Sequence, residues 1–214
     1  MQKSLLVALV MLSFLICACS AGTPPPSTPQ VVPVYSTAAA EPWLSELYNC
    51  AAQQNAVVLS RVDDSPTADI LLQIGESAAV SFAYQIDTEE ILIVTQRQSP
   101  VQNLTLVDAR ALFMGLGDPS VQVWVYAPDA DVQRVFDQFV MEGRSVTPSA
   151  LLAVNPQQMG DILNNQPNTV GILPKHWKMG DSRFVYTIPN IPVLAITKFE
   201  PQGVVKELIA CLQK

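Results

Sequence analysis

The sequence predicts an α/β layered fold whose central sheet is parallel or mixed. Two observations support this prediction. Apolar, β-branched runs of strand length alternate along the chain with segments of helical periodicity. Capping residues and glycines separate many of these segments, as expected at helix starts and stops. Strands that alternate with helices favour a sheet covered by helices.

The first segment, residues 1–18, is typical of a lipoprotein signal peptide. Lys3 is its only charge, and Leu5–Ala18 is an apolar run too short to span a membrane. Ile16 lies three places before Cys19 and a small alanine lies directly before it, as lipoprotein cleavage requires. We expect export and acylation of Cys19, with the chain held by lipid on the outer face of the cell membrane or the outer membrane. The alternative is an uncleaved membrane anchor.

Residues 19–33 are rich in Pro, Ser and Thr and are expected to form an extended tether. The folded part then begins near Val34. The 214-residue chain has a formal net charge of −7 and no basic run, which argues against nucleic acid and against electrostatic membrane binding. The lipid is therefore the only expected membrane contact.

The first half of the folded part contains most of the predicted strands. A helix is expected from Ser36 through Ala51, with Leu44, Leu47 and Tyr48 on one face. The predicted strands are Val31–Tyr35, Ala56–Arg61, Ala68–Ile74, Val80–Tyr84 and Glu90–Thr95.

The second half repeats the alternation. Thr105 and Asp108 form a capping-box pattern at the start of a helix, Leu106–Met114. A further helix begins at Asp129 or Asp131, with an apolar stripe formed by Val132, Val135, Phe136 and Phe139. The remaining predicted elements are strands Val121–Tyr126, Thr169–Leu173, Phe184–Ile188 and Pro192–Thr197, and helices Asn155–Asn164 and Gln202–Leu212.

Catalytic and metal-binding patterns are absent from the sequence. His176 is the only histidine, and there is no P-loop, GxSxG or HExxH motif. The adjacent acids at Asp63-Asp64 and Glu89-Glu90 are typical of solvated turns. The sequence therefore predicts neither an enzyme nor a cofactor or metal. Trp124, Trp177 and Tyr126 are candidates for lining a cleft, although a tryptophan on a strand, as at Trp124, is more often part of the core.

Two cysteines, Cys50 and Cys211, remain after the signal peptide and the acylated Cys19. In an oxidising compartment they suggest a disulfide between an early and a late helix. The alternative is two buried, unpaired thiols.

One segment resembles a known family. Pro100–Leu106 followed by Ala111–Gly115 is similar to the "NPVxNLTLxQLRxIFSG" segment of phosphate-type substrate-binding proteins of ABC transporters, which are type 2 periplasmic binding proteins. Ala68-Asp69-Ile70, Glu90–Thr95 and PNTVGILP at Pro167–Pro174 resemble further family segments in the same order.

This resemblance implies a two-lobed type 2 periplasmic-binding-protein fold with mixed sheets and a hinge between the lobes. Lobe 1 would comprise residues 34–95 plus 190–214, and lobe 2 residues 96–189. A small molecule or ion would bind between them, and an ABC permease would be the partner of a monomeric binding protein. The final helix would return to lobe 1 and place Cys211 near Cys50.

The chain departs from the family where the family binds phosphate. Its Ser-Gly-Thr segment is replaced by Ala130-Asp131-Val132, and Asp129 lies next to it. These carboxylates would repel phosphate at the positive end of a helix dipole. The other candidate ligand-binding residues are Ser36 and Thr37, which resemble the family's Ser-Thr loop or form an ordinary helix cap, and Glu76 and Ser77 after the Ala68–Ile74 strand.

We therefore expect a lipid-anchored solute-binding protein whose ligand is not phosphate and is neutral or cationic. The alternative is a degenerate binding-protein fold that serves as a structural or interaction module at the cell surface. A ligand-binding cleft favours the first, and a cleft filled by the chain's own side chains favours the second.

Overall fold

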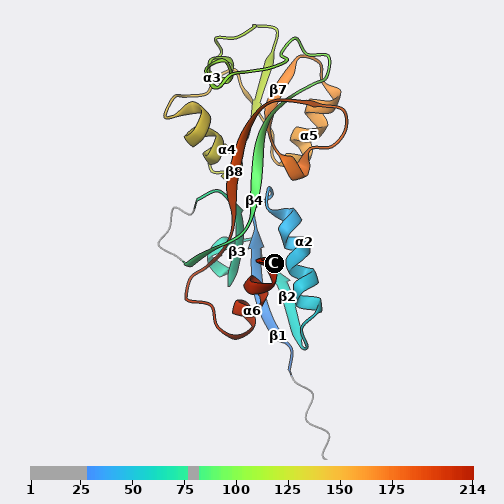
Figure 1. Cartoon of the computed structure of the whole chain (residues 1–214), viewed down its shortest axis with the longest axis vertical. Helices are drawn as coiled ribbons and strands as arrows, with labels where there is room; N and C mark the ends of the chain where they lie inside the picture. Colours follow the sequence, from blue (N-terminus) through green and yellow to red (C-terminus); the bar gives the residue numbers. More distant parts are fainter. Residues whose placement is uncertain (1–27, 77–81) are drawn as a thin grey trace, which may run out of the picture.

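A computed structural model of the chain describes residues 28–76 and 82–214. It contains two α/β lobes, one above the other in Figure 1, joined by two long strands that run through both. These strands are β4 (Phe82–Thr95) and β8 (Arg183–Thr197). The two-lobed α/β fold predicted from the sequence is confirmed. The signal peptide at 1–18, Cys19 and Ser77 lie outside the described residues.

The lower lobe in Figure 1 contains both ends of the described chain. Its elements are β1 (Gln30–Ser36), α2 (Glu41–Ala52), β2 (Val57–Arg61), the 3-10 helix η2 (Ser65–Thr67), β3 (Ile70–Ile74) and α6 (Gly203–Leu212). β1 lies between β2 and β3 and is parallel to both, and β3 pairs antiparallel with β8. Apolar side chains of the strands and of α2 and α6 are buried together in the core.

The upper lobe contains the middle of the chain. Its elements are α3 (Leu106–Phe113), β5 (Gln122–Val125), α4 (Asp131–Phe136), the π-helical turn η3 (Asp137–Met141), β6 (Leu151–Leu152), α5 (Pro156–Asn165), β7 (Thr169–Pro174) and the 3-10 helix η4 (Lys175–Trp177). β7 lies between β4, to which it is antiparallel, and β5, to which it is parallel. The strand order across both lobes is β2-β1-β3-β8-β4-β7-β5-β6.

The long strands differ from the sequence prediction, which expected two short strands in place of each. β4 and β8 pair antiparallel from Phe82 opposite Thr197 to Thr95 opposite Arg183. Four polar residues between the apolar runs of β4, namely Gln85, Asp87, Thr88 and Glu89, stay extended because each is paired with a residue of β8. Register shifts occur between Gln85 and Asp87 and between Glu89 and Ile91, in the stretch that connects the lobes, and between Ile93 and Val94, where β4 also pairs with β7.

Two helices also depart from the prediction. α2 begins at Glu41 instead of Ser36, because Ser36 is the last residue of β1. Tyr48 is 42% exposed, and Trp43 is buried in the core instead. Phe139 is 45% exposed because the helix widens into the π-helical turn at Asp137, which shifts the buried face.

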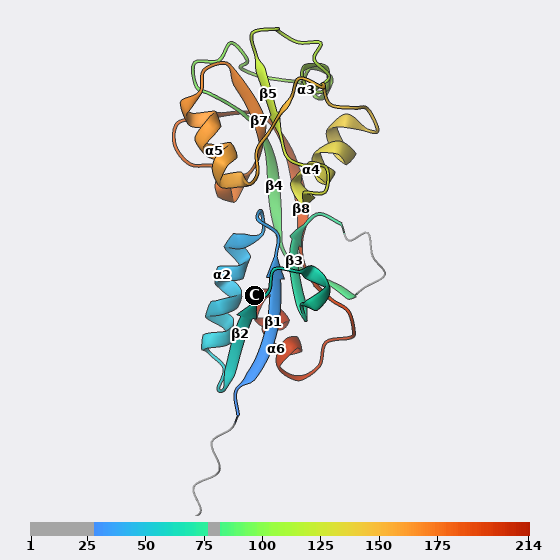
Figure 2. The same ribbon diagram turned by 180° about the vertical axis from the view of Figure 1, so that it is seen from behind.

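A disulfide joins Cys50 of α2 to Cys211 of α6, with the two Cα atoms 6.0 Å apart. The predicted pairing is confirmed, and it connects two helices of the same lobe (Figure 2). None of the helices in 28–76 and 82–214 has the length and apolarity needed to cross a bilayer.

Candidate functional site

The two lobes meet where β1 and β3 end in one lobe and α4 begins in the other (Figure 2). Asp131, the first residue of α4, reaches across this boundary. The Thr37 hydroxyl donates to Asp131 Oδ2 at 2.6 Å, and the Ile74 backbone amide donates to the same oxygen at 3.0 Å. Within its own lobe, Asp131 Oδ1 accepts from the backbone amide of Val132 at 2.9 Å. One carboxylate therefore connects both lobes by hydrogen bonds.

The local sequence explains this arrangement. Gly75 has a φ of 83°, which only glycine adopts without strain, and this turn ends β3 directly after Ile74. Thr37 follows the last residue of β1, and its hydroxyl oxygen also accepts from the Ala40 amide at 3.3 Å. The hydroxyl therefore has a fixed position and its proton is available for Asp131.

Asp131 is buried, with 4% of its surface exposed, and it forms no salt bridge within the described residues. Its charge is stabilised by three hydrogen bonds alone. Hydrogen bonds to an ionised acceptor are stronger than neutral ones, but burial of a charge without a counter-ion remains costly. The Asp131 carboxylate thus occupies the hydrogen-bond donors of the boundary that could bind an anion, and no positively charged side chain in the described residues neutralises it.

A cavity of about 320 Å³ lies beside this contact. Its lining comes from both lobes and includes Thr37, Asp129, Ala130 and Asp131, four of the residues predicted from the sequence. The complete lining also contains Tyr35, Ala38, Ala39, Tyr126, Ala127, Val132, Leu152, Ala153, Val154, Asn155 and Pro156.

The other predicted residues lie outside this cavity. Ser36 is buried, and its hydroxyl donates to the Thr37 carbonyl at 3.0 Å. Glu76 is exposed, and its carbonyl oxygen accepts from the Gln73 side chain at 3.1 Å. Neither residue lines the space beside Asp131. The guanidinium of the exposed Arg134 donates to the Asp129 carbonyl at 2.8 Å.

Tyr126 is a cavity residue whose hydroxyl is buried and has no hydrogen-bond partner among the described residues. Burial raises its pKa well above 10.0, and the nearby charge of Asp131 raises the pKa further. The sequence singled out Tyr126 as a cleft candidate, but it did not predict that the Tyr126 hydroxyl is buried near the charge of Asp131.

A second contact between the lobes involves the only histidine. The Trp177 indole donates to the Ala39 carbonyl at 2.9 Å, and the His176 ring packs on Trp43 with ring centroids 4.7 Å apart. His176 Nδ1 lies 2.9 Å from Glu89, which is 2% exposed. The prediction of a solvated turn at Glu89 is wrong, because β4 is continuous there and its neighbour is this histidine.

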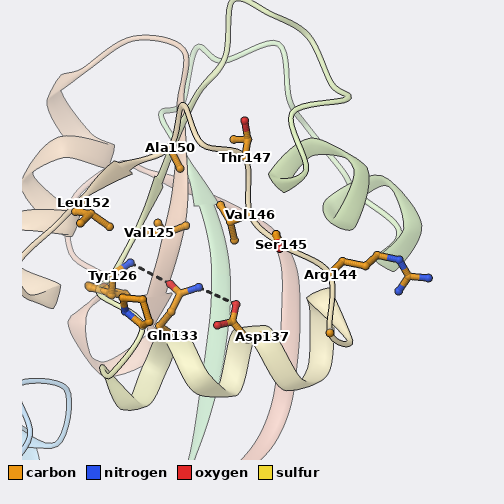
Figure 3. A pocket seen from close by; sticks show the side chains of 12 residues that line it. Val125, Tyr126, Gln133, Asp137, Arg144, Ser145, Val146, Thr147, Ala150 and Leu152 are labelled. Carbon is orange, nitrogen blue, oxygen red and sulfur yellow. Dashed lines mark hydrogen bonds between the residues drawn. The ribbon is translucent and has the colours of Figure 1, made fainter.

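A larger cavity of about 510 Å³ is lined by upper-lobe residues alone (Figure 3), and it shares Tyr126 and Leu152 with the cavity between the lobes. Gln133 crosses one wall, where its carbonyl oxygen accepts from the Tyr126 amide at 3.0 Å and its amide donates to Asp137 at 2.9 Å. Burial raises the pKa of Asp137. These hydrogen bonds of Gln133 hold the end of β5 against α4, so they serve the fold of the upper lobe. We therefore place the candidate site at the smaller cavity between the lobes.

The structure thus consists of two α/β lobes with a cavity at their boundary. The structure is similar to a putative phosphate ABC transporter substrate-binding protein with bound phosphate from Clostridium perfringens, with a TM-score of 0.75 and 13% identity over 86% of this chain and 93% of that chain. It is also similar to an ABC-type phosphate transport receptor from Vibrio cholerae, with a TM-score of 0.62 and 16% identity over 86% and 93%.

A regulatory domain shares the same fold. The CcmR regulatory domain of Synechocystis PCC6803, in complex with 2-PG, gives a TM-score of 0.64 at 9% identity and covers 86% of this chain and 95% of that chain. No protein-family model and no curated protein sequence matches the chain. At these identities the likeness shows the fold alone, and the similar structures described here are binding proteins and a regulatory domain.

Proposed function

We propose that the chain is an extracytoplasmic, lipid-anchored solute-binding protein of the ABC-transporter type whose ligand is not phosphate. The observation that supports this proposal is the position of the Asp131 carboxylate. It accepts hydrogen bonds from Thr37 and Ile74 of one lobe and begins a helix of the other. A solute bound between two lobes in this fold would contact the same boundary.

Electrostatics argue against phosphate as the ligand at this boundary. A phosphate near the N-terminus of α4 would lie within a few ångströms of the Asp131 carboxylate, and the donors it requires are already occupied. Repulsion between like charges at about 4 Å costs on the order of 4 kcal/mol at an effective dielectric constant of about 20. The cavity beside Asp131 remains available to a neutral or positively charged solute.

The lipid anchor and the partner follow from the sequence. The predicted leader at residues 1–18 and the predicted acylation of Cys19 support a location outside the cytoplasm. The disulfide Cys50–Cys211 is consistent with an oxidising compartment. A permease would receive the solute from the anchored monomer.

Isothermal titration calorimetry with phosphate tests the exclusion. We expect no heat of binding for the wild-type protein. The triple variant Ala130→Ser, Asp131→Gly, Val132→Thr removes the carboxylate and adds two hydroxyls, and we expect it to gain phosphate affinity. Phosphate binding by the wild type would contradict the proposal.

A second candidate function is supported by the same contact. Because Asp131 joins the two lobes directly by hydrogen bonds, the joined lobes could serve as an interaction module at the cell surface. A thermal-shift screen with amino acids, sugars, polyamines and oxyanions separates the two functions. A ligand at about a hundred times its dissociation constant adds about 2.7 kcal/mol of stability, whereas an interaction module would respond to none of these compounds.

A further inference from the structure

We propose that the cavity between the lobes binds a small organic cation, an alkylammonium compound with at most a few polar groups. This inference rests on the proposed solute-binding function and specifies its ligand class. Three features of the cavity support it: the sign of its charge, two buried polar groups without their natural partners, and its aromatic walls.

The charge of the lining is entirely negative. Asp129 and Asp131 both line the cavity, and none of its fifteen lining residues is Lys, Arg or His. Arg134 is close in sequence, but its guanidinium donates to the Asp129 backbone carbonyl and is not part of the lining. The whole chain has a formal net charge of −7, which adds to the attraction of a cation.

Two buried groups lack the partner that an ammonium ion would supply. Asp131 is a buried carboxylate with hydrogen-bond donors but no positive charge against it in the described part of the chain. The Tyr126 hydroxyl is buried with no hydrogen-bond partner there. Buried charges in proteins are normally paired, and buried hydroxyls are normally hydrogen-bonded. The two groups are near enough that the charge of Asp131 raises the pKa of Tyr126.

The walls suit an alkylammonium ion better than a hydrated metal ion. Tyr35 and Tyr126 are aromatic, and the other lining residues include several alanines together with Val132 and Pro156. Cations are attracted to aromatic ring faces, and methyl or methylene groups pack on apolar walls. Within the described residues no cluster of His, Cys, Asp or Glu could hold a metal ion. The volume of about 320 Å³ lies at the small end of ligand sites.

The ligand would also stabilise the closed form. Asp131 contacts Thr37 and Ile74 across the boundary only when the lobes are together. A cation beside Asp131 would neutralise the buried charge in that arrangement and not in an open one. Its differential affinity for the closed form would therefore shift the population towards closure.

Calorimetric titration of the purified full-length protein in low salt tests the ligand class with two matched pairs of probes. Choline is compared with 3,3-dimethyl-1-butanol, which replaces its nitrogen by carbon, and putrescine is compared with 1,4-butanediol. We expect at least one cation to bind, and its neutral partner to bind at least about tenfold more weakly, because the neutral compound lacks the close charge pair with the cavity carboxylates.

Three variants connect the binding to the cavity. Asp129→Asn should weaken binding of the cation about five- to tenfold, whereas Asp64→Asn, the same charge change at an exposed site of the lower lobe, should leave it unchanged. Tyr126→Phe should also weaken binding, without lowering the melting temperature of the ligand-free protein, because it removes a buried hydroxyl that has no partner.

The outcomes separate this inference from the function on which it rests. Equal binding of a cation and its neutral partner, or binding of a sugar or neutral amino acid alone, overturns the cation inference and leaves solute binding intact. Equal effects of Asp129→Asn and Asp64→Asn overturn the assignment to this cavity. If no solute of any class binds, the proposed function fails as well, and the interaction module remains.

Discussion

At the scale of single residues, Thr37 is the side chain of the lower lobe that holds Asp131. Its hydroxyl donates a 2.6 Å hydrogen bond to the carboxylate. Thr37→Val keeps the shape of the side chain and removes this donor. We expect a loss of about 1.5–3 kcal/mol in the free energy of unfolding, the range for hydrogen bonds to charged groups. Urea denaturation followed by circular dichroism measures the change.

The matched control is Thr67→Val, at the end of the exposed 3-10 helix η2. Its hydroxyl donates to the Asp64 carbonyl at 2.8 Å, a neutral acceptor at the surface. We expect this substitution to cost less than about 1 kcal/mol, because water replaces an exposed hydrogen bond. Similar losses for both variants would show that the carboxylate of Asp131 does not depend on Thr37.

At the scale of one element, the start of α3 depends on a capping box. The Thr105 hydroxyl accepts from the Asp108 amide at 3.2 Å, and Asp108 accepts from the Thr105 amide at 3.1 Å. Thr105→Ala should lower the stability of the protein by about 1 kcal/mol, the typical cost of losing an N-cap. Thr105→Ser keeps the hydroxyl and should retain most of the stability in thermal unfolding.

The stability lost in Thr105→Ala should depend on pH and should be smaller in acid. Hydrogen bonds from Thr105 lower the pKa of Asp108 below 3.8 in the folded protein. A lowered folded pKa gives stability that is present above the unfolded pKa and is lost as pH falls through the folded value. The difference between wild type and Thr105→Ala should therefore shrink in acid, and a constant difference from pH 7 to pH 2 would contradict the role of Asp108.

The elements that the sequence predicted well are those with local signals. The caps at Thr105 and Asn155 depend on side chains within three residues of the helix start, so spacing alone identifies them. The continuity of β4 and β8 was missed because the polar residues between the apolar runs are held extended by a partner strand distant in sequence. The exposed Phe139 was missed because a π-helical turn gives no clear periodicity.

The candidate site divides in the same way. The segment Ala130-Asp131-Val132 could be aligned with a family motif, so the sequence identified Asp131 and its position at a helix start. Its partner Thr37 is 94 residues away, and the Ile74 amide has no side-chain signature at all. The burial of Glu89 against His176 likewise depends on how the lobes pack, which no local pattern encodes.

At the scale of the whole molecule, the disulfide closes a loop that includes the entire upper lobe. Cys50 and Cys211 are 161 residues apart in sequence, yet both belong to helices of the lower lobe. The double variant Cys50→Ala, Cys211→Ala should lose about 2–5 kcal/mol, because the unfolded chain is no longer constrained. Thermal unfolding of the oxidised and reduced wild type checks this result, since reduction should have no effect on the double variant.

The closure of the two lobes is the property on which the site depends. The lobes are hydrogen-bonded at two places on the boundary. Asp131 accepts from Thr37 at one place, and the Trp177 indole donates to the Ala39 carbonyl at the other. β4 and β8 connect the lobes, and the register shifts along them provide a stretch of irregular pairing where the strands can bend.

Asp131→Ala removes both hydrogen bonds from the lower lobe to Asp131 and leaves the Trp177–Ala39 hydrogen bond in place. We expect the radius of gyration in small-angle X-ray scattering to increase relative to the wild type, and Asp64→Ala to leave it unchanged. Addition of a cation that binds in the calorimetric titration should lower the radius of gyration of the wild type but not that of Asp131→Ala. Superimposable profiles for all three proteins would mean that the tryptophan contact maintains closure by itself, and that Asp131 fills the boundary without controlling it.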